Sequence, residues 1–517
     1  MALGLGQGRK LAIFLVMALG QFMALLDTQI VAASIGSIQA GLSAAPDEID
    51  WLQTAYLMAE IVMIPLSAYL AQALSTRWMF VLSAGLFTVS SLMCGLSWDL
   101  PSMIVFRAVQ GFVGGAMIPM CFSTGFTFFR GRQAAMATAT LGVISTLAPT
   151  LGPTIGGWIT DSFSWRWLFL INVPPGLLVT VALIFLGRID RARPSMLLRI
   201  DWLHVASLAV SLAGLQFILE EGPRHQWLDD PAVTAVAWTA FIAALVFIER
   251  CLFSKMPVVR LASFRRPGFK AAAVLSFAVG FGLYGVVYLT PVFLARVRGF
   301  NSLEIGTTVF VAGAFMTAIA PVAAWLAGRV DQRVVMAVGL AFYATSFWMM
   351  SGVTSQWGFW QLFWPQVVRA WAVLLCMVSV VGMALNEAPP EELQDASGLT
   401  NLMRNLGGAV GIALVNTGLI DFFRLHLERL SEGLGHSSPD GAATAIQGLT
   451  LRFAASGLDP RQAGGMALGV LGQGVALQAL TLAFSDVFRL MSWLFVACIV
   501  LVIFCRKGTM TSTAAAH

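Results

Sequence analysis

The sequence predicts an all-α polytopic membrane protein. Hydrophobic residues make up 58% of its 517 residues, charged residues make up only 11%, and the mean hydropathy is +0.80. A soluble domain carries about 25% charged residues, so this chain has too little polar surface for water. Its apolar residues also gather in runs that are long enough to cross a bilayer as helices, which need about 20 residues each.

We predict fourteen transmembrane helices in three groups. The first six form an N-terminal half (1–187), a basic linker and two inserted helices follow (188–267), and the last six belong to a C-terminal half (268–517). Two six-helix halves are typical of secondary transporters, whose substrate site lies between the repeats. The predicted spans are 11–36, 49–71, 77–97, 101–128, 133–160, 166–187, 201–220, 232–252, 269–293, 304–327, 333–353, 360–386, 394–420 and 487–505.

Residues 421–486, between the last two predicted spans, form an insert of mixed polarity. It contains a turn rich in Gly, Ser and Pro at 433–441. Segment 462–484 is apolar but rich in Gly and Gln, and counting it as a span would place the basic C-terminal tail on the outer side. We therefore interpret it as an amphipathic external helix.

The lysine and arginine residues predict the orientation, because cytoplasmic loops carry an excess of them. With the N-terminus inside, the inner connections are rich in basic residues, including those at 188–199 and 250–270, and the tail has Arg506 and Lys507. We therefore expect both termini in the cytoplasm. The outer connections carry only Arg166, Arg224, Arg296 and Arg298.

Two motifs lie in the fourth and fifth predicted spans. Residues 107–116 read RAVQGFVGGA, and residues 142–157 read GVISTLAPTLGPTIGG. The former is similar to the RxxQGxxxG signature of major facilitator transporters, and the latter resembles the GxxxGPxxGG signature of the antiporters in that superfamily. The resemblance implies the major facilitator fold, here with two inserted helices.

Further motifs indicate one branch of this superfamily. LDTQIV at 26–31 resembles the LDxTIVNVAL signature of the fourteen-helix drug:proton antiporters, and the segments at 165–176 and 397–407 are similar to other marks of that branch. Over nearly its whole length the chain resembles EmrB-like multidrug exporters. The resemblance implies a place in the bacterial inner membrane, a periplasmic membrane-fusion (EmrA-like) protein and an outer-membrane (TolC-like) channel as partners.

One loop departs from the family. The GxLaDRxGRR pattern between the second and third spans reads AYLAQALSTR at 68–77, with Gln72 in place of the acidic residue and Ser75 in place of a glycine. The inner charge latch ascribed to this loop is therefore not expected in its usual form. The corresponding loop of the second half, GRVDQR at 328–333, keeps its charges.

Asp27 and Arg107 are ionisable residues within predicted spans, where burial in hydrocarbon is costly and a function is the default hypothesis. At about 1.5 Å per helical residue, Asp27 lies roughly 24 Å from the inner end of its span and Arg107 roughly 9 Å from the outer end of its own. Both therefore fall in the outer half of the membrane. We expect a proton-coupling pair, with Gln110 on the same helix face as Arg107; the alternative is a static ion pair that fixes helix packing.

Glu60, near the midpoint of the second span, is the second candidate for proton coupling. We expect it to stay protonated until a cationic substrate or water reaches it, or else to be a neutral acid that hydrogen-bonds across helices. Arg404 and Arg369, in the thirteenth and twelfth spans, are candidates for a substrate or coupling network. Their alternative role is pairing with carbonyl groups or lipid headgroups.

The fifth span combines prolines, which remove backbone donors and permit bending, with glycines, which let another helix approach closely. We predict an antiporter hinge against the opposite half; the alternative is close packing without movement. The predicted hinge residues are Gly142, Pro149, Gly152, Pro153, Gly156 and Gly157.

Several functional classes find no support in the sequence. It has no Walker A motif, and its five His and six Cys show no metal-ligand spacing, so we expect no direct ATP use, cofactor or metal. An enzyme would need a nucleophile and base at membrane depth, and a sensor an appended soluble domain. The basic residues orient the chain, so no nucleic-acid partner is expected.

The expected function is proton-driven export of small amphipathic or lipophilic compounds from the cytoplasm or the inner leaflet. The alternative is a dedicated exporter of a single metabolite, such as a siderophore, an aromatic acid or a phenolic. The two differ only in the chemistry of the substrate cavity.

Overall fold

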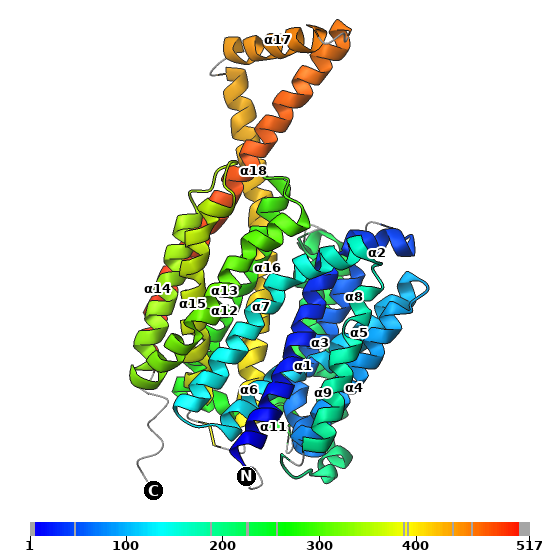
Figure 1. Ribbon diagram of the computed structural model, residues 1–517, viewed down its shortest axis with the longest axis vertical. Helices are drawn as coiled ribbons and strands as arrows, with labels where there is room; N and C mark the ends of the chain where they lie inside the picture. Colours follow the sequence, from blue (N-terminus) through cyan, green and yellow to red (C-terminus); the bar gives the residue numbers. More distant parts are fainter. Residues whose placement is uncertain are drawn as a thin grey trace.

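The computed structural model describes residues 6–45, 48–186, 189–223, 227–254, 257–385, 388–389, 392–436, 439–455 and 459–505. Long helices run side by side in one bundle, and a helical hairpin extends from one end of it (Figure 1). No strand occurs among the described residues. We call the end of the bundle at which the first helix begins the inner end, following the predicted orientation.

The first half contains the six spans predicted for it. The fourth predicted span is divided into α5 and α6, and α5 begins at a capping box in which the Asp99 side chain accepts from the backbone N–H of Ser102. The helices are α1 (Gln7–Ala33), α2 (Ile35–Leu42), α3 (Trp51–Leu74), α4 (Thr76–Gly95), α5 (Leu100–Gly114), α6 (Met117–Phe128), α7 (Arg132–Ser162), α8 (Trp167–Leu170) and α9 (Val173–Leu186).

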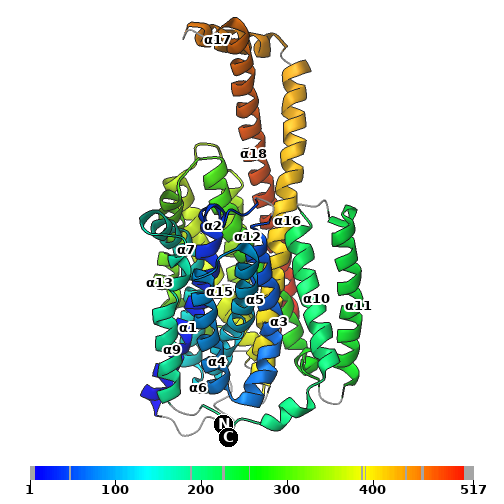
Figure 2. The ribbon, with the colours of Figure 1, turned by 90° about the vertical axis from the view of Figure 1, so that its right-hand side faces the viewer.

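The inserted pair stands at the side of the bundle (Figure 2). Helix α10 packs on α3, and α11 packs mainly on α10. Most of the large apolar side chains of α11, such as Trp238 and Phe241, are exposed, as expected for a helix that faces lipid. The elements of this region are η1 (Pro194–Arg199), α10 (Trp202–Glu221), η2 (Trp227–Asp229), α11 (Pro231–Phe253) and η3 (Leu261–Arg265).

The second half meets the first mainly where α7 packs on α13, and also where α3 and α6 pack on α16 and α7 packs on α15. Within the half, α12 packs on α16 and α14 on α15 and α18. Its elements are α12 (Pro267–Arg296), α13 (Ser302–Arg329), α14 (Gln332–Met350), α15 (Phe359–Leu385), α16 (Leu393–His436), α17 (Pro439–Ala455), α18 (Pro460–Leu501) and η4 (Val502–Phe504).

The last two spans are much longer than predicted. Helix α16 has 44 residues and α18 has 42, and both continue beyond the bundle, with α17 across the tip (Figures 1 and 2). Segment 462–484, which we expected to be a separate external helix, is instead the first part of α18. No proline follows Pro460 in this helix, so nothing breaks it before the membrane segment.

Thirteen helices among the described residues are long and apolar enough to cross a membrane. They include every predicted span except the fifth, 133–160, which is the 31-residue helix α7. Helix α7 lies between α1 of its own half and α13 of the other. A helix that is covered by protein on two sides needs fewer apolar residues than one surrounded by lipid, so α7 completes the fourteen predicted spans.

Candidate functional site

Asp27 and Arg107 meet inside the first half, as predicted. The Arg107 Nη1 atom of α5 lies 2.5 Å from Oδ2 of Asp27 in α1, and both side chains are 0% exposed. Gln110, one turn after Arg107, accepts a hydrogen bond from Nη1 of Arg107 at 2.8 Å and donates one to Oδ1 of Asp27 at 3.1 Å. The three-residue spacing of Arg107 and Gln110 places both on the α5 face that turns toward α1.

Two further polar residues, Asn172 and Ser91, complete this cluster, and neither was predicted from the sequence. Asn172, at the start of the sixth span, donates to Oδ1 of Asp27 at 2.6 Å and to Oγ of Ser91 at 3.0 Å. Both residues are buried. The sequence did contain a signal for Asn172, which lies between an apolar run and two prolines. A side-chain amide that is buried within the membrane needs a hydrogen-bond partner.

Two aromatic rings pack against the Arg107 guanidinium of this cluster. The Arg107 guanidinium carbon lies 4.2 Å from the centre of the Tyr56 ring and 5.8 Å from that of Phe169, and both rings attract the cation. The Arg107 Nη2 atom is buried without a hydrogen-bond partner among the described residues. The three side chains that hydrogen-bond to the Asp27 carboxylate all donate to it, and no described neighbour accepts a hydrogen bond from it. This arrangement suits the ionised carboxylate, which can only accept. Protonation would remove the charge that holds Arg107.

Glu60 lies on α3 one turn after Tyr56, close enough to both Arg107 and Arg404 for electrostatic attraction. It is half-buried and makes no hydrogen bond or ion pair within the described part of the chain. Arg404 of α16 donates to Oδ1 of Asn401 at 2.5 Å, and its guanidinium lies 5.4 Å from the Phe122 ring centre. An acid of one half and an arginine of the other thus interact electrostatically where α3 meets α16.

Arg369 lies apart from these groups. It is buried on α15, in the interior of the second half. We predicted Arg369 and Arg404 as members of one network; of the two, Arg404 is the one that interacts electrostatically with Glu60 among the described residues.

The predicted hinge residues all lie in α7, which is helical throughout. The side chains of Pro149 and Pro153 lie outside the described residues. A Cβ added to Gly152 would lie 2.4 Å from Cβ of Gln29 in α1, and Gly156 faces the same helix. These glycines therefore serve contact within the first half, whereas Gly142 faces Leu374 and Met377 of the other half. Gly157 is half-buried, and its carbonyl accepts from Thr160.

The two halves are hydrogen-bonded at the inner end of the bundle. Gln72 donates to Asp395 at 3.3 Å, Gln394 donates to Thr76 at 2.7 Å, and Ser397 of α16 donates to the Pro119 carbonyl at 2.8 Å. All the side-chain hydrogen bonds between the halves that involve described residues lie there. Gln72 thus replaces the expected acid with a neutral donor and still joins the halves.

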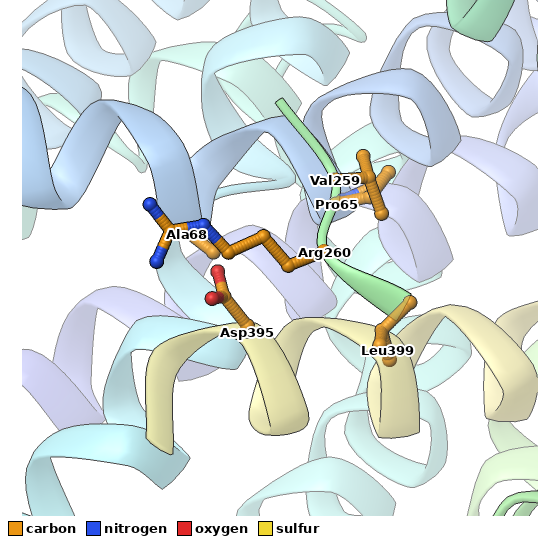
Figure 3. Close-up of a pocket in the computed structure, with 6 residues that line it drawn as sticks. All are labelled: Pro65, Ala68, Val259, Arg260, Asp395 and Leu399. Carbon is orange, nitrogen blue, oxygen red and sulfur yellow. The ribbon is translucent and has the colours of Figure 1, made fainter. Parts of the chain in front are cut away.

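The linker after the inserted helices also reaches this end. Figure 3 shows Arg260 extending between α3 and α16, with its guanidinium beside Asp395. Val259 and Arg260 line a shallow pocket together with Pro65 and Ala68 of α3 and Asp395 of α16. Thr76 in turn donates to Asp190 through N at 2.9 Å, and burial raises the pKa of the Asp190 carboxyl in spite of that bond. The inner mouth is therefore closed.

The comparisons with known proteins agree with this architecture. The family profile described as "Major Facilitator Superfamily" matches residues 17–412. The chain is 38% identical over 499 residues to the "Colistin resistance protein EmrB" of Acinetobacter baumannii (96% of each chain), and 27% identical over 507 residues to the "Multidrug export protein EmrB" of Escherichia coli (97% of this chain, 96% of the relative). Among solved structures, the proton:xylose symporter XylE superposes with a TM-score of 0.59 at 12% identity, over 97% of each chain.

Proposed function

This chain belongs to the major facilitator superfamily, and we propose that it is a proton-driven antiporter that exports small amphipathic or lipophilic compounds across the inner membrane. The observation that carries the proposal is the fully buried Asp27–Arg107 pair, in which three donors surround one carboxylate. An ionisable pair with this degree of burial is costly to form inside a membrane helix bundle. A group that takes up and releases a proton in each cycle would justify that cost.

The coupling step begins with protonation of Asp27 from the outer side. The neutral acid no longer holds Arg107, whose guanidinium stays against the Tyr56 ring and turns toward Glu60, a carboxylate that also attracts it. Tyr56 and Glu60 both lie on α3, and α3 carries the contact with α16. The charge change at Asp27 is thereby transmitted to the place where the halves meet, and it biases their equilibrium.

Glu60 and Arg404 provide the proposed substrate site. Glu60 is the more accessible of the two, and it attracts the cationic end of an amphipathic compound in competition with Arg404. Phe122 and Tyr284, which interact with Arg404, offer aromatic surface to the apolar part. Binding of a cation to Glu60 and protonation of Asp27 both alter the charge that acts on Arg107, so the two events compete.

Alternating access follows from breaking and remaking the inner contacts. In this structure, Gln72, Gln394 and Ser397 hold the inner mouth closed. We infer that the two halves rock about the α7–α13 contact, and that substrate enters when these bonds open.

The helical hairpin beyond the bundle supports the proposed partners, a periplasmic EmrA-like membrane-fusion protein and a TolC-like outer-membrane channel. Its helices expose apolar side chains such as Leu451, Met466 and Leu468. In the predicted orientation, with both termini in the cytoplasm, the hairpin points into the periplasm. Deletion of residues 431–460 should reduce efflux from whole cells more than transport in proteoliposomes; equal losses would argue against a docking role.

The function is tested by flux measurements in proteoliposomes with an imposed pH gradient and a panel of cationic and neutral amphipathic compounds. We expect gradient-driven flux of several chemically different compounds. If none is transported, the proposed multidrug antiport is wrong. If only one compound of the panel is transported, the chain is a dedicated exporter.

A further inference from the structure

Helix α4 supplies two buried side chains, Ser91 and Cys94, that contact the two amides of the Asp27 cluster. They are three residues apart and therefore share one face of the helix, and both are 0% exposed. Helix α4 packs on α5, which carries Gln110, and on α9, which begins directly after Asn172. Each of the two residues is hydrogen-bonded to one amide, and in the described part of the chain neither is hydrogen-bonded to Asp27. Their effect on that carboxylate therefore passes through the amides.

Ser91 fixes the orientation of the Asn172 amide. Its hydroxyl donates to the Phe169 carbonyl at 2.9 Å, so its hydrogen is committed and its oxygen is left to accept. The Asn172 NH2 group donates to this oxygen at 3.0 Å and to Oδ1 of Asp27 at 2.6 Å. If the amide turned over, its carbonyl oxygen would face the Ser91 oxygen with no hydrogen between them. The amide therefore keeps its N–H groups toward the carboxylate.

Cys94 acts on the Gln110 amide in the same way. Its thiol donates to Oε1 of Gln110 at 3.6 Å, and the same oxygen accepts a hydrogen bond from Nη1 of Arg107 at 2.8 Å. The NH2 group of Gln110 is thereby left for Oδ1 of Asp27, at 3.1 Å. In the proposed coupling step Arg107 turns away from the protonated acid. Of the two donors to the Gln110 oxygen, Cys94 is then the one that remains.

The orientation of the two amides determines which form of Asp27 the site favours. A carboxylic acid needs an acceptor for its O–H, whereas a carboxylate needs only donors. While Ser91 and Cys94 hold both amides with their N–H groups inward, neither amide offers its carbonyl oxygen to the O–H of protonated Asp27. Hydrogen bonds to the charged form of an acid favour that form, so this arrangement promotes release of the proton.

We propose that Ser91 and Cys94 are positioning residues of the proton site, which prevent the Asn172 and Gln110 amides from turning over and so make Asp27 release its proton. This inference rests on the proposed function, because it requires that Asp27 takes up and releases a proton. It adds α4 to the helices that control the site, although α4 supplies no group that is hydrogen-bonded to the carboxylate among the described residues.

The charges around Asp27 are separate from these two residues. Ser91 has no titratable group, so its replacement by alanine alters none of the charges, and a change in the titration of Asp27 then reports the amide orientation. Among the described residues, the other charged or titratable groups that act on Asp27, act on its arginine or lie on the helices packed against α1 are Arg107, Tyr56, Glu60, Cys121, Arg132 and Asp161.

The test follows the protonation of Asp27 by infrared difference spectroscopy, in a pH titration of the full-length protein in lipid. The carbonyl stretch of the protonated acid is assigned to Asp27 by its loss in Asp27→Asn. In Ser91→Ala the Asn172 amide is free to turn its oxygen toward the acid, so the midpoint should move to higher pH by roughly one unit, a tenfold change in proton affinity. Cys94→Ala should move it in the same direction by less, since a thiol is a weak donor.

Ser90→Ala is the matched control on the same helix. The Ser90 hydroxyl donates to the carbonyls of Leu86 and Phe87 in its own helix, so its removal should leave the midpoint unchanged. Cys94→Ser keeps a donor on the Gln110 oxygen and should restore the wild-type midpoint.

The possible failures of this inference and of the proposed function are distinguishable. If the Asp27 band titrates in the wild type but the alanine variants at Ser91 and Cys94 keep its midpoint, the inference is overturned and the proposed function stands. An equal shift in Ser90→Ala would mean that the packing of α4, not the amide orientation, controls the midpoint, and would equally overturn it. A wild type whose Asp27 band does not titrate would overturn both.

Discussion

The two halves each bury an arginine in their fourth span, and they compensate it differently. Arg107 of the first half has a carboxylate, an amide and an aromatic ring around it, all supplied by the protein. Arg369 of the second half has aromatic neighbours, and the described residues give it no acid. Among the described residues, the same repeat position thus holds an acid–base pair in one half and an arginine without an acid in the other.

The largest expected effect comes from Arg107→Met. This change leaves the Asp27 carboxylate buried without its cation, and breaking a buried pair in this way costs about 3–5 kcal/mol. The free energy of unfolding in detergent should fall by that order. The corresponding change Arg369→Met leaves no carboxylate without its cation among the described residues and should cost clearly less.

The double variant Asp27→Asn/Arg107→Met sharpens this point. Removal of both charges leaves no uncompensated ion, so the double variant should be more stable than Arg107→Met alone. Equal instability of the two variants would mean that Arg107 acts through its contacts with Tyr56 and Phe169 rather than through its charge.

A smaller effect is expected from Asn172→Leu. Asn172 donates to the Asp27 carboxylate and to Ser91, and a hydrogen bond to a charged group contributes about 1.5–3 kcal/mol. We expect gradient-driven transport to fall by roughly tenfold, since about 1.4 kcal/mol corresponds to a factor of ten. Asn401→Leu, which alters the Arg404 neighbourhood, should change apparent substrate affinity instead; the same effect from both variants would contradict separate roles for the two clusters.

The smallest effects concern glycines that allow close helix contact in each half. A Cβ at Gly111 would lie 2.2 Å from the Tyr56 carbonyl oxygen, and one at Gly407 would lie 2.0 Å from that of Phe277. Backbone cannot move aside easily, so Gly111→Ala and Gly407→Ala should each cost about 1–3 kcal/mol of stability, measured by unfolding in detergent. Gly464→Ala, which meets nothing within 4 Å, is the control; a comparable loss there would show that the measurement does not report helix contact.

The sequence predicted the parts of the site that are charged. Asp27, Arg107 and Gln110 were identified because ionisable and amide groups inside apolar runs are few, and depth along each helix was enough to pair them. Asn172 and Ser91 were missed because neutral polar residues also occur in packed helices. Their role depends on which helices touch, which a single sequence does not show.

The number of spans was predicted from the sequence, whereas the lengths of the last two long helices were not. All fourteen spans were predicted from hydropathy; thirteen of them correspond to helices that are long and apolar enough to cross a membrane, and the fourteenth is α7, which protein covers on two sides. The lengths of α16 and α18 were underestimated because hydropathy ends at the membrane surface, whereas a helix continues until a proline, a glycine turn or a cap ends it. The separation of Arg369 from Arg404 was hidden for a similar reason, since both lie at membrane depth on neighbouring spans.

The most direct test of the account compares two kinds of transport in proteoliposomes that contain wild type or Asp27→Asn. Exchange of labelled for unlabelled substrate needs only the movement of the two halves, whereas accumulation driven by a pH gradient also needs the proton carrier. We predict that Asp27→Asn keeps exchange near the wild-type rate and loses gradient-driven accumulation. Gradient-driven accumulation at the wild-type level in Asp27→Asn would contradict the assignment of Asp27 as the proton carrier.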